Sequence, residues 1–358
     1  MNSQSAVLSW LRSAPSLCLA VSLVLCITAA ETASAAAPPL KVVRTPLAKW
    51  IAARRHIAAD TLVKFTTGAL RKNRFRTFVL ALADQNWAQV ATLAGELSYR
   101  VVARREARRW FAMAYDRRGR DPTIVVNLNA HRELILGAPH VPFETGTAEQ
   151  AILLLRDAGG RAAIFAGAHR CASATYTACD GTTSVCGASE PYRDSDVGHN
   201  PNTLYHIAHE ELAAHWPATL IVSLHGMAND NDGVKTSVIV SNGINANDDA
   251  KETAATRLRL FLGRQMPPKG TVVSCNLGND DKHGARRLCG TTNVQGRLVN
   301  GDANVCLGSV SQGTGRFIHL EQDPGTRDPY ANDWQNIDQH PFHNALVAGL
   351  KRVSPKVP

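Results

Sequence analysis

The chain has 358 residues, of which 44% are hydrophobic and 19% are charged, and its formal net charge is +9. This composition excludes a disordered or fibrous protein, and it provides for a sizeable core in one large domain, or in one domain with a smaller companion. The charge is unevenly placed. Residues 36–120 carry 18 Lys and Arg against 5 Asp and Glu, whereas residues 121–358 carry 20 against 24.

Residues 1–37 have the pattern of a secretory signal peptide. Arg12 precedes an apolar run from Leu17 to Ala30, and Ala33-Ser34-Ala35 forms an Ala-x-Ala cleavage site. An uncleaved anchor is the alternative, although the apolar run is short for a membrane span. No later stretch predicts a transmembrane segment. The sequence therefore predicts a secreted or periplasmic protein.

Six cysteines follow this signal, in two groups of three: Cys171, Cys179, Cys186, Cys275, Cys289 and Cys306. An even number in an exported chain predicts up to three disulfides. Because each group holds an odd number, at least one bridge must join the groups if all six pair. A structural zinc site is the competing interpretation, but the cysteines lack the paired Cys-x-x-Cys spacing of such sites.

Residues 38–120 predict a basic helical N-terminal region. The stretch from Leu47 to Tyr115 is rich in Ala, Leu, Arg and Val, lacks proline, and repeats its apolar positions at three and four residues. Arg104 to Trp110 is interpreted as a basic helical stripe. It is either a solvated helix surface or a contact for an anionic polymer or membrane face. No nucleic-acid motif is present, and export argues against a nucleic-acid partner.

After Asp121-Pro122 the pattern changes to apolar, β-branched strands that alternate with helices. We expect strands at 123–128, 134–138, 161–167, 219–226, 237–240 and 316–322. We expect helices ending near 157 and spanning 202–216, 248–264 and 341–352, with long loops at 171–200 and 275–313. This order predicts an α/β domain over residues 121–358: a three-layer, mostly parallel or mixed sheet with helices on both faces.

His140 and Glu144 lie in the loop between the strand 134–138 and a helix that Thr145 or Thr147 could cap. In open α/β sheets, ligands gather where strands end in this way. A histidine and a carboxylate close together on a loop are two of the three protein ligands that a catalytic zinc uses. A loop histidine bonded to the backbone is the simpler alternative.

His225 and Glu321 also end strongly apolar strands. A polar group delivered there is costly to bury unless it has a partner. His140, Glu144 and His225 together supply a three-ligand zinc site, which leaves Glu321 as the acid/base that exchanges a proton with water. Strand alternation places His319 on the face of Glu321, where it either orients that carboxylate or packs as a core residue.

These motifs resemble zinc amidohydrolases of the N-formylglutamate amidohydrolase and poly-γ-glutamate hydrolase kind, which are similar in fold to zinc carboxypeptidases. The resemblance covers about residues 122–350. It rests on Ala-Pro-His140 to Glu144-Thr-Gly-Thr-Ala-Glu149, on Ser-Leu-His225-Gly, and on Phe-Ile-His-Leu-Glu321-Gln. It implies that His140, Glu144 and His225 bind zinc and that Glu321 is the base. The spacing from His140 to Glu144 lies between those of the polyglutamate enzymes and the carboxypeptidases, so Glu149 is the fallback carboxylate ligand.

The resemblance implies an exported zinc-dependent hydrolase of a peptide or γ-linked amide, from a substrate such as cell wall or polyglutamate. Arg170 is predicted to steady the oxyanion or to clamp a substrate carboxylate, with a structural ion pair as the alternative. Arg327 is a weaker candidate for the same role. His209 and His215 resemble a helical zinc-protease motif, but their spacing of six places them on different helix faces.

A rival hypothesis is a non-catalytic protein that binds an anionic polymer or the cell envelope through the basic N-terminal region. Analysis for bound zinc distinguishes the two.

Overall fold

A computed structural model describes residues 37–62, 64–65, 67–228, 236–246, 252–266, 271–275 and 287–358. The predicted signal peptide lies outside the described residues, except for Ala37, and so does the start of the helix predicted from Asp248. Residues Ala35–Pro358 group as one compact unit. No helix of the described residues has the length and apolar character that crossing a membrane requires.

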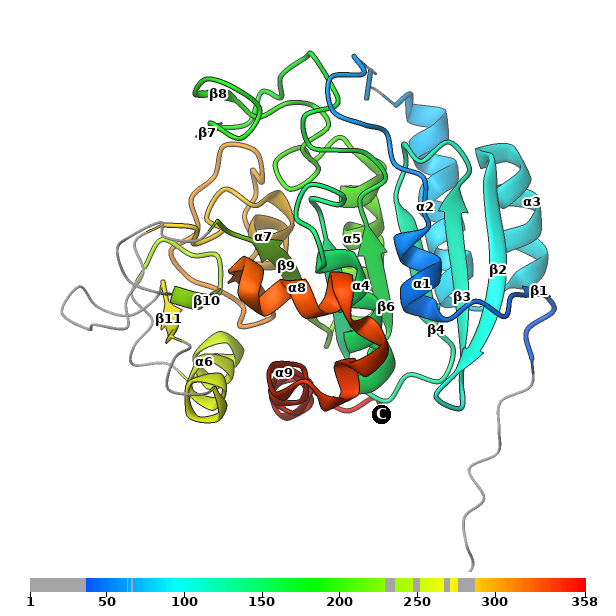
Figure 1. The fold of residues 1–358 in the computed structure, drawn as a ribbon. Helices are drawn as coiled ribbons and strands as arrows, with labels where there is room; N and C mark the ends of the chain where they lie inside the picture. The colour runs from blue at the N-terminus through cyan, green and yellow to red at the C-terminus, as the bar shows by residue number, and fades with distance from the viewer. Residues whose placement is uncertain are drawn as a thin grey trace, which may run out of the picture. The chain divides into compact units, whose positions relative to one another are not determined.

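Ten strands form one mixed sheet in the order β1-β2-β3-β4-β6-β5-β9-β12-β10-β11 (Figure 1). Their bounds are β1 Lys41–Val42, β2 Tyr99–Glu106, β3 Arg109–Asp116, β4 Thr123–Asn127, β5 Leu134–Ala138, β6 Ala162–Phe165, β9 Leu220–Gly226, β10 Thr236–Ser241, β11 Thr271–Ser274 and β12 Phe317–Gln322. The central strands β6, β5, β9 and β12 are mutually parallel, so their carboxyl ends meet at one edge of the sheet. A further pair, β7 (Thr182–Thr183) and β8 (Glu190–Pro191), stands apart from this sheet.

Helices cover both faces of the sheet. The helices are α1 Leu47–Ala52, α2 Ala69–Ala83, α3 Trp87–Leu97, α4 Thr147–Leu154, α5 Leu204–His215, α6 Ala254–Gln265, α7 Val294–Val299, α8 Pro324–Asn332 and α9 Pro341–Val353, with a π-helix at Leu155–Gly159 and a 3₁₀ helix at Trp334–Gln339. One core cluster joins α1, α4, α6, α8 and α9 to the sheet, and a second joins α2, α3, α5 and α7 to the opposite face. The predicted fold class, a mixed α/β sheet between two helical layers, is confirmed.

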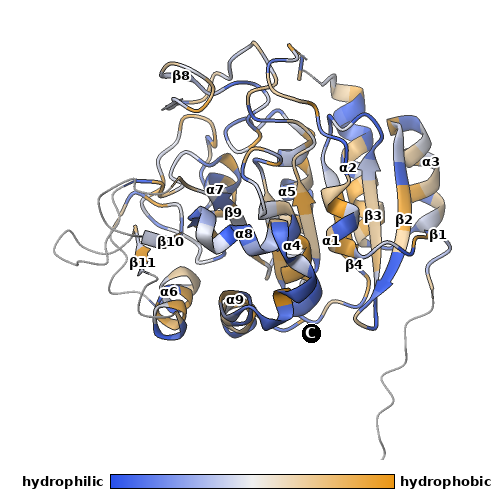
Figure 2. Ribbon diagram, in the orientation of Figure 1, coloured by the Kyte–Doolittle hydropathy of each residue, from blue (hydrophilic) through white to orange (hydrophobic). Residues whose placement is uncertain are grey.

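The parallel strands in the middle of the sheet are largely apolar, as expected where both faces are covered, whereas part of β2 is hydrophilic (Figure 2). Leu134 and Leu136 of β5 enter the first cluster, while Ile135 enters the second. Gly137 is required where β5 passes beneath α5, since a Cβ there would lie 2.8 Å from the Tyr205 hydroxyl. Alternation with period two therefore decides which side chains of each strand reach which layer.

The helical prediction for residues 47–115 is right for α1, α2 and α3 and wrong for residues 99–116. These residues form the antiparallel hairpin β2–β3, in which Glu106 pairs with Arg109. Ala107 and Arg108 make its two-residue turn with positive φ angles of 47° and 63°. Turns of this kind normally carry Asn-Gly or Asp-Gly, so the sequence lacked the usual hairpin signal. The predicted basic helical stripe at 104–110 is therefore the tip of a hairpin.

The sheet continues across residue 120, where the sequence changes from basic to slightly acidic. Strand β3 pairs antiparallel with β4, and β4 pairs antiparallel with β6. The change in charge at this point therefore does not coincide with a break in the sheet. Strand β11, and the short helices α7 and α8, were not predicted.

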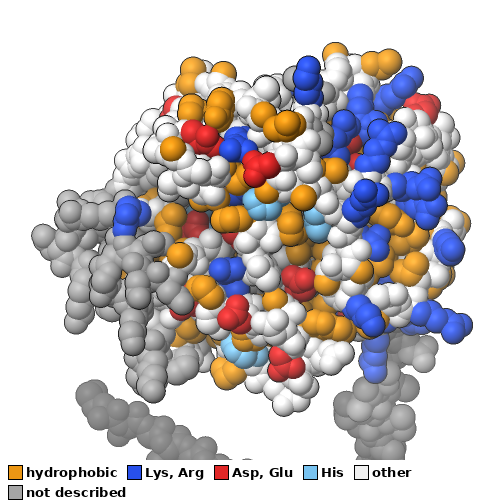
Figure 3. Space-filling model, turned by 45° about the horizontal axis from the view of Figure 1, so that its top comes forward, with side chains coloured by type: hydrophobic (Ala, Val, Ile, Leu, Met, Phe, Trp, Pro, Cys, Tyr) orange, Lys and Arg blue, Asp and Glu red, His pale blue; other side chains and the backbone are white. Residues whose placement is uncertain are grey.

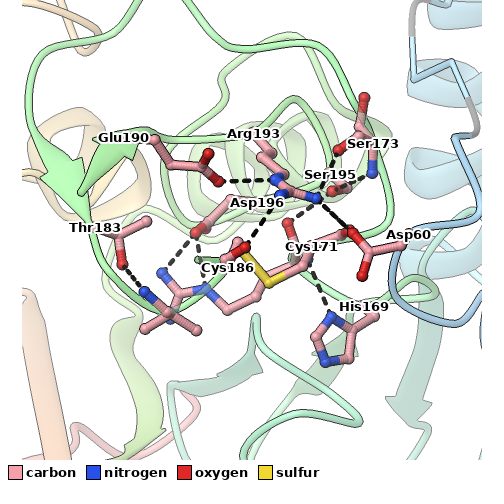
Figure 4. The surroundings of a disulfide bond; sticks show 12 residues. Asp60, His169, Cys171, Ser173, Thr183, Cys186, Glu190, Arg193, Ser195 and Asp196 are labelled. Carbon is pink, nitrogen blue, oxygen red and sulfur yellow. Dashed lines mark hydrogen bonds and ion pairs between the residues drawn. A yellow bond between two sulfur atoms is a disulfide. The ribbon is translucent and has the colours of Figure 1, made fainter. Parts of the chain in front are cut away.

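All six described cysteines are paired, as Cys171–Cys186, Cys179–Cys306 and Cys275–Cys289. The second bridge joins the two cysteine groups, which confirms the odd-count argument. The loop 171–200 is further held by Arg193, whose guanidinium donates to Glu190, Asp60 and the carbonyl of Cys186 (Figure 4). This loop is thus braced by covalent and ionic contacts.

Candidate metal centre

His140 and Glu144 lie in the loop that follows β5, as predicted. The amide of Glu144 donates to the carbonyl of His140 at 2.9 Å, so the loop makes one helical turn. That turn brings His140 Nδ1 to 2.6 Å from Glu144 Oε1. The helix α4 then begins after Gly146, whose φ of 87° suits glycine, and neither Thr145 nor Thr147 caps it. The predicted threonine cap is therefore wrong, because Thr147 donates back to the Glu144 carbonyl instead.

His225 ends β9, the strand beside β5. Its Nδ1 lies 3.1 Å from His140 Nδ1 and 3.4 Å from Glu144 Oε2. The backbone amide of Gly226 donates to that same carboxylate oxygen at 3.0 Å. All three side chains are buried, with exposed fractions of 2% for His140, 6% for Glu144 and 2% for His225. Three ligand-type atoms from two strand ends therefore converge on one point.

The second nitrogen of each imidazole has its own partner. His140 Nε2 lies 3.1 Å from Asp196 Oδ1, and His225 Nε2 lies 2.9 Å from Ser223 Oγ. Such contacts fix the ring orientation and the tautomer of a metal-binding histidine. They leave both Nδ1 atoms facing the shared point beside Glu144.

This donor set fits a zinc ion. A tetrahedral site with Zn–N bonds near 2.0–2.1 Å has neighbouring donors about 3.3 Å apart. The two Nδ1 atoms lie 3.1 Å apart, and the Glu144 carboxylate places Oε1 2.6 Å from that of His140 and Oε2 3.4 Å from that of His225. The three residues form one of the potential metal-binding groups of the described residues. Glu149 belongs to none of those groups. The carboxylate that lies beside both histidines is therefore that of Glu144 and not that of Glu149.

Glu321 and His319 lie beside His225 on the next strand. Glu321 pairs in register with His225, and His319 pairs with Ser223. His319 Nε2 lies 3.1 Å from Glu321 Oε1, and the rings of His319 and His225 have centroids 4.2 Å apart. The predicted common face of His319 and Glu321 is confirmed, and His319 contacts the carboxylate directly.

Glu321 retains one unpartnered oxygen. Its Oε2 is buried and accepts no hydrogen bond from the residues that the structure describes. His319 Nδ1 is likewise buried and has no hydrogen-bond partner among these residues. Buried polar atoms normally have a partner, which is often water or an ion. The unpartnered oxygen of a residue that lines the cleft is therefore a candidate partner for water, an ion or a substrate.

These residues line a cleft with a volume of about 870 Å³. Its wall includes His140, Glu144, His225 and Glu321, and it continues along two disulfide-linked loops. Residues 182–185 on one side precede Cys186, and residues 287–293 on the other include Cys289. The centre thus lies in an open cleft large enough for a peptide-sized ligand.

Arg170 forms a buried ion pair, which was the alternative to its predicted role. Its Nε and one terminal nitrogen donate to Asp196 Oδ2 at 2.9 and 2.6 Å. Its other terminal nitrogen lies 3.3 Å from His140 Nδ1 and 3.7 Å from Glu144 Oε1. Arg170 therefore has one nitrogen directed at the candidate metal centre, while the other two hold Asp196.

Arg327 lines the cleft, but its guanidinium nitrogens donate to backbone carbonyls. Its Nε donates to Gln322, and its terminal nitrogens donate to Thr145 and Met227. Gln322 is the last residue of β12, and Thr145 and Met227 lie in the segments that follow β5 and β9. Arg327 therefore joins the three strand ends that carry the candidate ligands, and it has a positioning role.

Charge inside the centre is closely balanced. Burial and the neighbouring Arg170 lower the pKa of His140, but the carboxylates of Glu144 and Asp196 outweigh them and raise that pKa to about 9. Burial opposes ionisation of Glu144, yet the adjacent His140 and His225 hold its pKa well below the usual range. Burial lowers the pKa of His225 to about 4. A neutral His225 and an ionised Glu144 are the forms that a metal requires, whereas His140, with its raised pKa, has to release a proton when a metal binds.

Sequence reasoning missed Asp196, His199 and Ser223. Asp196 Oδ1 lies 2.9 Å from His199 Nδ1 as well as near His140, and the His199 ring stacks on Tyr192 with centroids 3.6 Å apart. Asp196 and His199 come from the loop 171–200, where no strand end marks them. Ser223 carried a usable signal, since it lies two residues before His225 on the same face of β9.

His140 with Asp196 and His199, and His225 with His319 and Glu321, are also potential metal-binding groups of the described residues. Two histidine combinations away from the cleft are excluded by their surroundings. His209 is buried beneath β5, where burial lowers its pKa to about 3, whereas His215 lies 3.3 Å from Asp84 near the surface. They share no site. A potential group formed by Asp157, Asp338 and His343 is already bridged by Arg156.

No family model matches the sequence, and no curated protein matches it. Solved structures similar to this chain include a bacteriophage poly-γ-glutamate hydrolase, with a TM-score of 0.30, 14% identity, and coverage of 65% of this chain and 87% of that one. An N-formylglutamate amidohydrolase from Ralstonia eutropha JMP134 has a TM-score of 0.36, 12% identity, and coverage of 65% and 97%. A succinylglutamate desuccinalase from Vibrio parahaemolyticus has a TM-score of 0.34, 10% identity, and coverage of 72% and 79%.

The first two names are those of the families that the motifs around His140, His225 and Glu321 resemble.

Proposed function

We propose that this chain is an exported zinc-dependent hydrolase of a peptide or γ-linked amide bond. The observation that carries the proposal is the convergence of His140 Nδ1, His225 Nδ1 and the Glu144 carboxylate in an open cleft. A zinc ion held there would polarise the scissile carbonyl and lower the pKa of water. An amide substrate, such as a cell-wall peptide or a polyglutamate chain, follows from the resemblance of the motifs.

Glu321 is the proposed general base. Glu321 lines the cleft beside His225, and its Oε2 has no hydrogen-bond partner among the described residues, so in this proposal Oε2 accepts a proton from water and returns it to the leaving amine. The contact with His319 Nε2 leaves Oε2 as the atom for this transfer. Both histidine ligands and Glu144 are engaged with one another, which leaves Glu321 as the carboxylate without a structural role.

Arg170 is proposed to steady negative charge on the substrate. Two of its nitrogens are fixed by Asp196, which holds the guanidinium in one orientation. The third nitrogen reaches the candidate metal centre, where charge develops during amide hydrolysis. Asp196 has a second effect, since it also holds the distal nitrogen of His140.

Export is proposed from the cysteines together with the N-terminal apolar segment. All three pairs in the described structure have the separation of disulfides, and such bridges persist in oxidising compartments. Thiol titration of the unfolded, unreduced protein should find close to no free thiol among the six. Several free thiols would contradict export into an oxidising compartment.

The test compares wild type with Glu321→Gln on the same preparations. We expect about one zinc per chain in both proteins, and hydrolysis of at least one member of a panel of α- and γ-linked amides by wild type only. The variant keeps the shape of the side chain but cannot accept a proton, so activity should fall by about 10²–10⁴-fold. Loss of zinc would make Glu321 a ligand, and unchanged activity would make it structural. Absence of zinc in wild type after refolding with zinc would overturn the proposal.

A further inference from the structure

The surface of residues 37–120 is strongly basic. Eleven Lys and Arg side chains are exposed there against three Asp and Glu, whereas the described part of residues 121–358 exposes five of each sign. Figure 3 shows Lys and Arg gathered over the side of the chain that carries α1–α3 and β1–β3. This segregation makes a field of one sign, because few acids lie between the cations.

Most of these cations make no ion pair with another described residue. Arg74 pairs with Glu96, and Arg105 lies over the ring of Trp110. By contrast, the side chains of Arg55, Arg117 and Arg118 make no ion pair within the part of the chain that the structure describes. Exposed like charges repel one another, so an unpaired group of this kind gains most from an external anion.

Arg55, Arg117 and Arg118 come together from two segments, and we call them the basic rim. Arg117 and Arg118 occupy the turn after β3, followed by Gly119. A Cβ at Gly119 would lie 2.2 Å from the carbonyl oxygen of Arg55, so the two backbones are in contact. The amide of Ile57 also donates to the Gly119 carbonyl at 3.1 Å.

The basic rim adjoins the cleft. Strand β3 runs in the same direction as β6, because each is antiparallel to β4, so the turn after β3 lies at the sheet edge where the central strands end. Ile57 forms a bridge with Ala168, and the amide of His169 donates to the Ile57 carbonyl. The His169 ring contacts Phe143, which lines the cleft. A ligand chain on the rim can therefore continue into the cleft.

Protection of an open sheet edge explains only part of this charge. Lys41 lies on the edge strand β1, and Arg100 and Arg105 lie on β2 outside the two residues that pair with β1, where charged side chains discourage pairing with other chains. The basic rim lies on turns, where no edge needs protection. Proteins that bind a membrane surface usually insert exposed apolar side chains into it. No large apolar side chain of the described residues is exposed on the turn 117–119 or on segment 54–57.

We propose that the basic rim binds an anionic polymer, a chain with repeated carboxylate or phosphate groups, beside the cleft. Guanidinium groups pair with both anions through two parallel hydrogen bonds. Several neighbouring cations can pair with successive anionic groups of one such chain. Binding requires no metal and no turnover, so it goes beyond the proposed hydrolase function.

The test measures binding of fluorescent polyphosphate and of poly-L-glutamate, each of fixed length, by anisotropy over a range of salt concentrations. Wild type should bind both, with affinity that falls as salt rises. Arg117→Glu with Arg118→Glu should weaken binding by about tenfold or more, and should lower the slope of log affinity against log salt by about two. The milder Arg117→Ala with Arg118→Ala should give a smaller loss in the same direction.

The matched control is Arg257→Glu with Arg264→Glu on α6. Both residues are exposed, and the double reversal changes the net charge by the same amount. This control should bind within about twofold of wild type, because local charge rather than total charge sets the contact. His140→Ala should also bind normally, which separates this result from any failure of the hydrolase proposal.

Equal weakening by the control would overturn the basic rim as the site. Absence of binding to both polymers at low salt would overturn it too. Binding to anionic phospholipid vesicles without binding to either soluble polymer would assign the surface to a membrane instead. Circular dichroism and thermal unfolding of each variant show whether the protein measured is folded.

Discussion

Two arginines of the basic rim and two buried arginines of the α/β region have opposite surroundings. Arg117 and Arg118 are exposed, on a turn, and have no ion-pair partner among the described residues. Arg170 and Arg297 are buried, and each donates to a carboxylate through two nitrogens. Burial of a charge is tolerated only with such partners, whereas an exposed charge remains hydrated without them.

This difference indicates two different roles for the arginines. The inner arginines hold loops and carboxylates in place, so that strand ends present His140, Glu144 and His225 to one another. Arg117 and Arg118 make no ion pair with another described residue. We therefore expect them to contribute to binding a partner outside the chain and not to the stability of the fold. Substitutions in the two regions should therefore affect different measurements, and the following predictions test that separation.

The largest expected effect is loss of the metal from the cleft. His140→Ala or His225→Ala should each reduce bound zinc from about one per chain to near zero after dialysis, and reduce hydrolysis to background, because two protein ligands rarely retain zinc. Metal analysis and amide assays on one preparation measure this. His215→Ala is the control and should keep zinc. Full zinc occupancy in a variant would show that its histidine is not a ligand.

Next in size is the choice of carboxylate. Glu144→Gln should weaken zinc binding by at least about 100-fold, as it removes a ligand and not merely an outer contact. Glu149→Gln should leave affinity unchanged, since Glu149 lies on α4 outside the candidate groups. Competition with a chelator measures both affinities. The reverse order would move the carboxylate ligand to Glu149.

A third prediction compares the two classes of arginine by stability. Arg297 is 2% exposed and donates to Asp180 and to the carbonyls of Thr291 and Cys306. Arg297→Ala leaves these acceptors unsatisfied and should lower the free energy of unfolding by about 2 kcal/mol. Arg118→Ala should change it by less than about 0.5 kcal/mol. Urea unfolding measures both, and equal losses would remove the distinction between inner and outer arginines.

The sequence predicted those parts of the structure that depend on strand periodicity. β5 has the predicted bounds, and β9 and β12 lie within a residue of theirs, because apolar runs that end in a polar residue mark both a buried strand and its carboxyl end. His140, Glu144, His225 and Glu321 were found by the same signal, and the structure brings all four to one cleft. Their chemical roles remain predictions.

The sequence failed where a tertiary contact decides the outcome. The hairpin β2–β3 has a turn of Ala107 and Arg108 without glycine or asparagine, and its apolar run Trp110–Ala114 also fits a helix. Its strand form comes from pairing with β4, which no local pattern reveals. Asp196 likewise has no local signal, because its partners Arg170 and His140 are 26 and 56 residues away.

The smallest effect predicted concerns Ser223, whose hydroxyl lies 2.9 Å from His225 Nε2. Partners of this kind orient a metal-binding imidazole, and their loss typically lowers metal affinity by about 10–100-fold. Ser223→Ala should lower the affinity for zinc by about tenfold, the lower end of this range, because the neighbouring strands still hold the His225 ring. The matched control is Ser354→Ala, another buried serine, whose hydroxyl donates to the Leu350 carbonyl in α9. Chelator competition should show weaker zinc binding for the first variant and wild-type binding for the second. Unchanged zinc affinity in Ser223→Ala would mean that His225 does not depend on Ser223 for its orientation. Polyphosphate binding should be the same in both variants, because the basic rim contains neither serine.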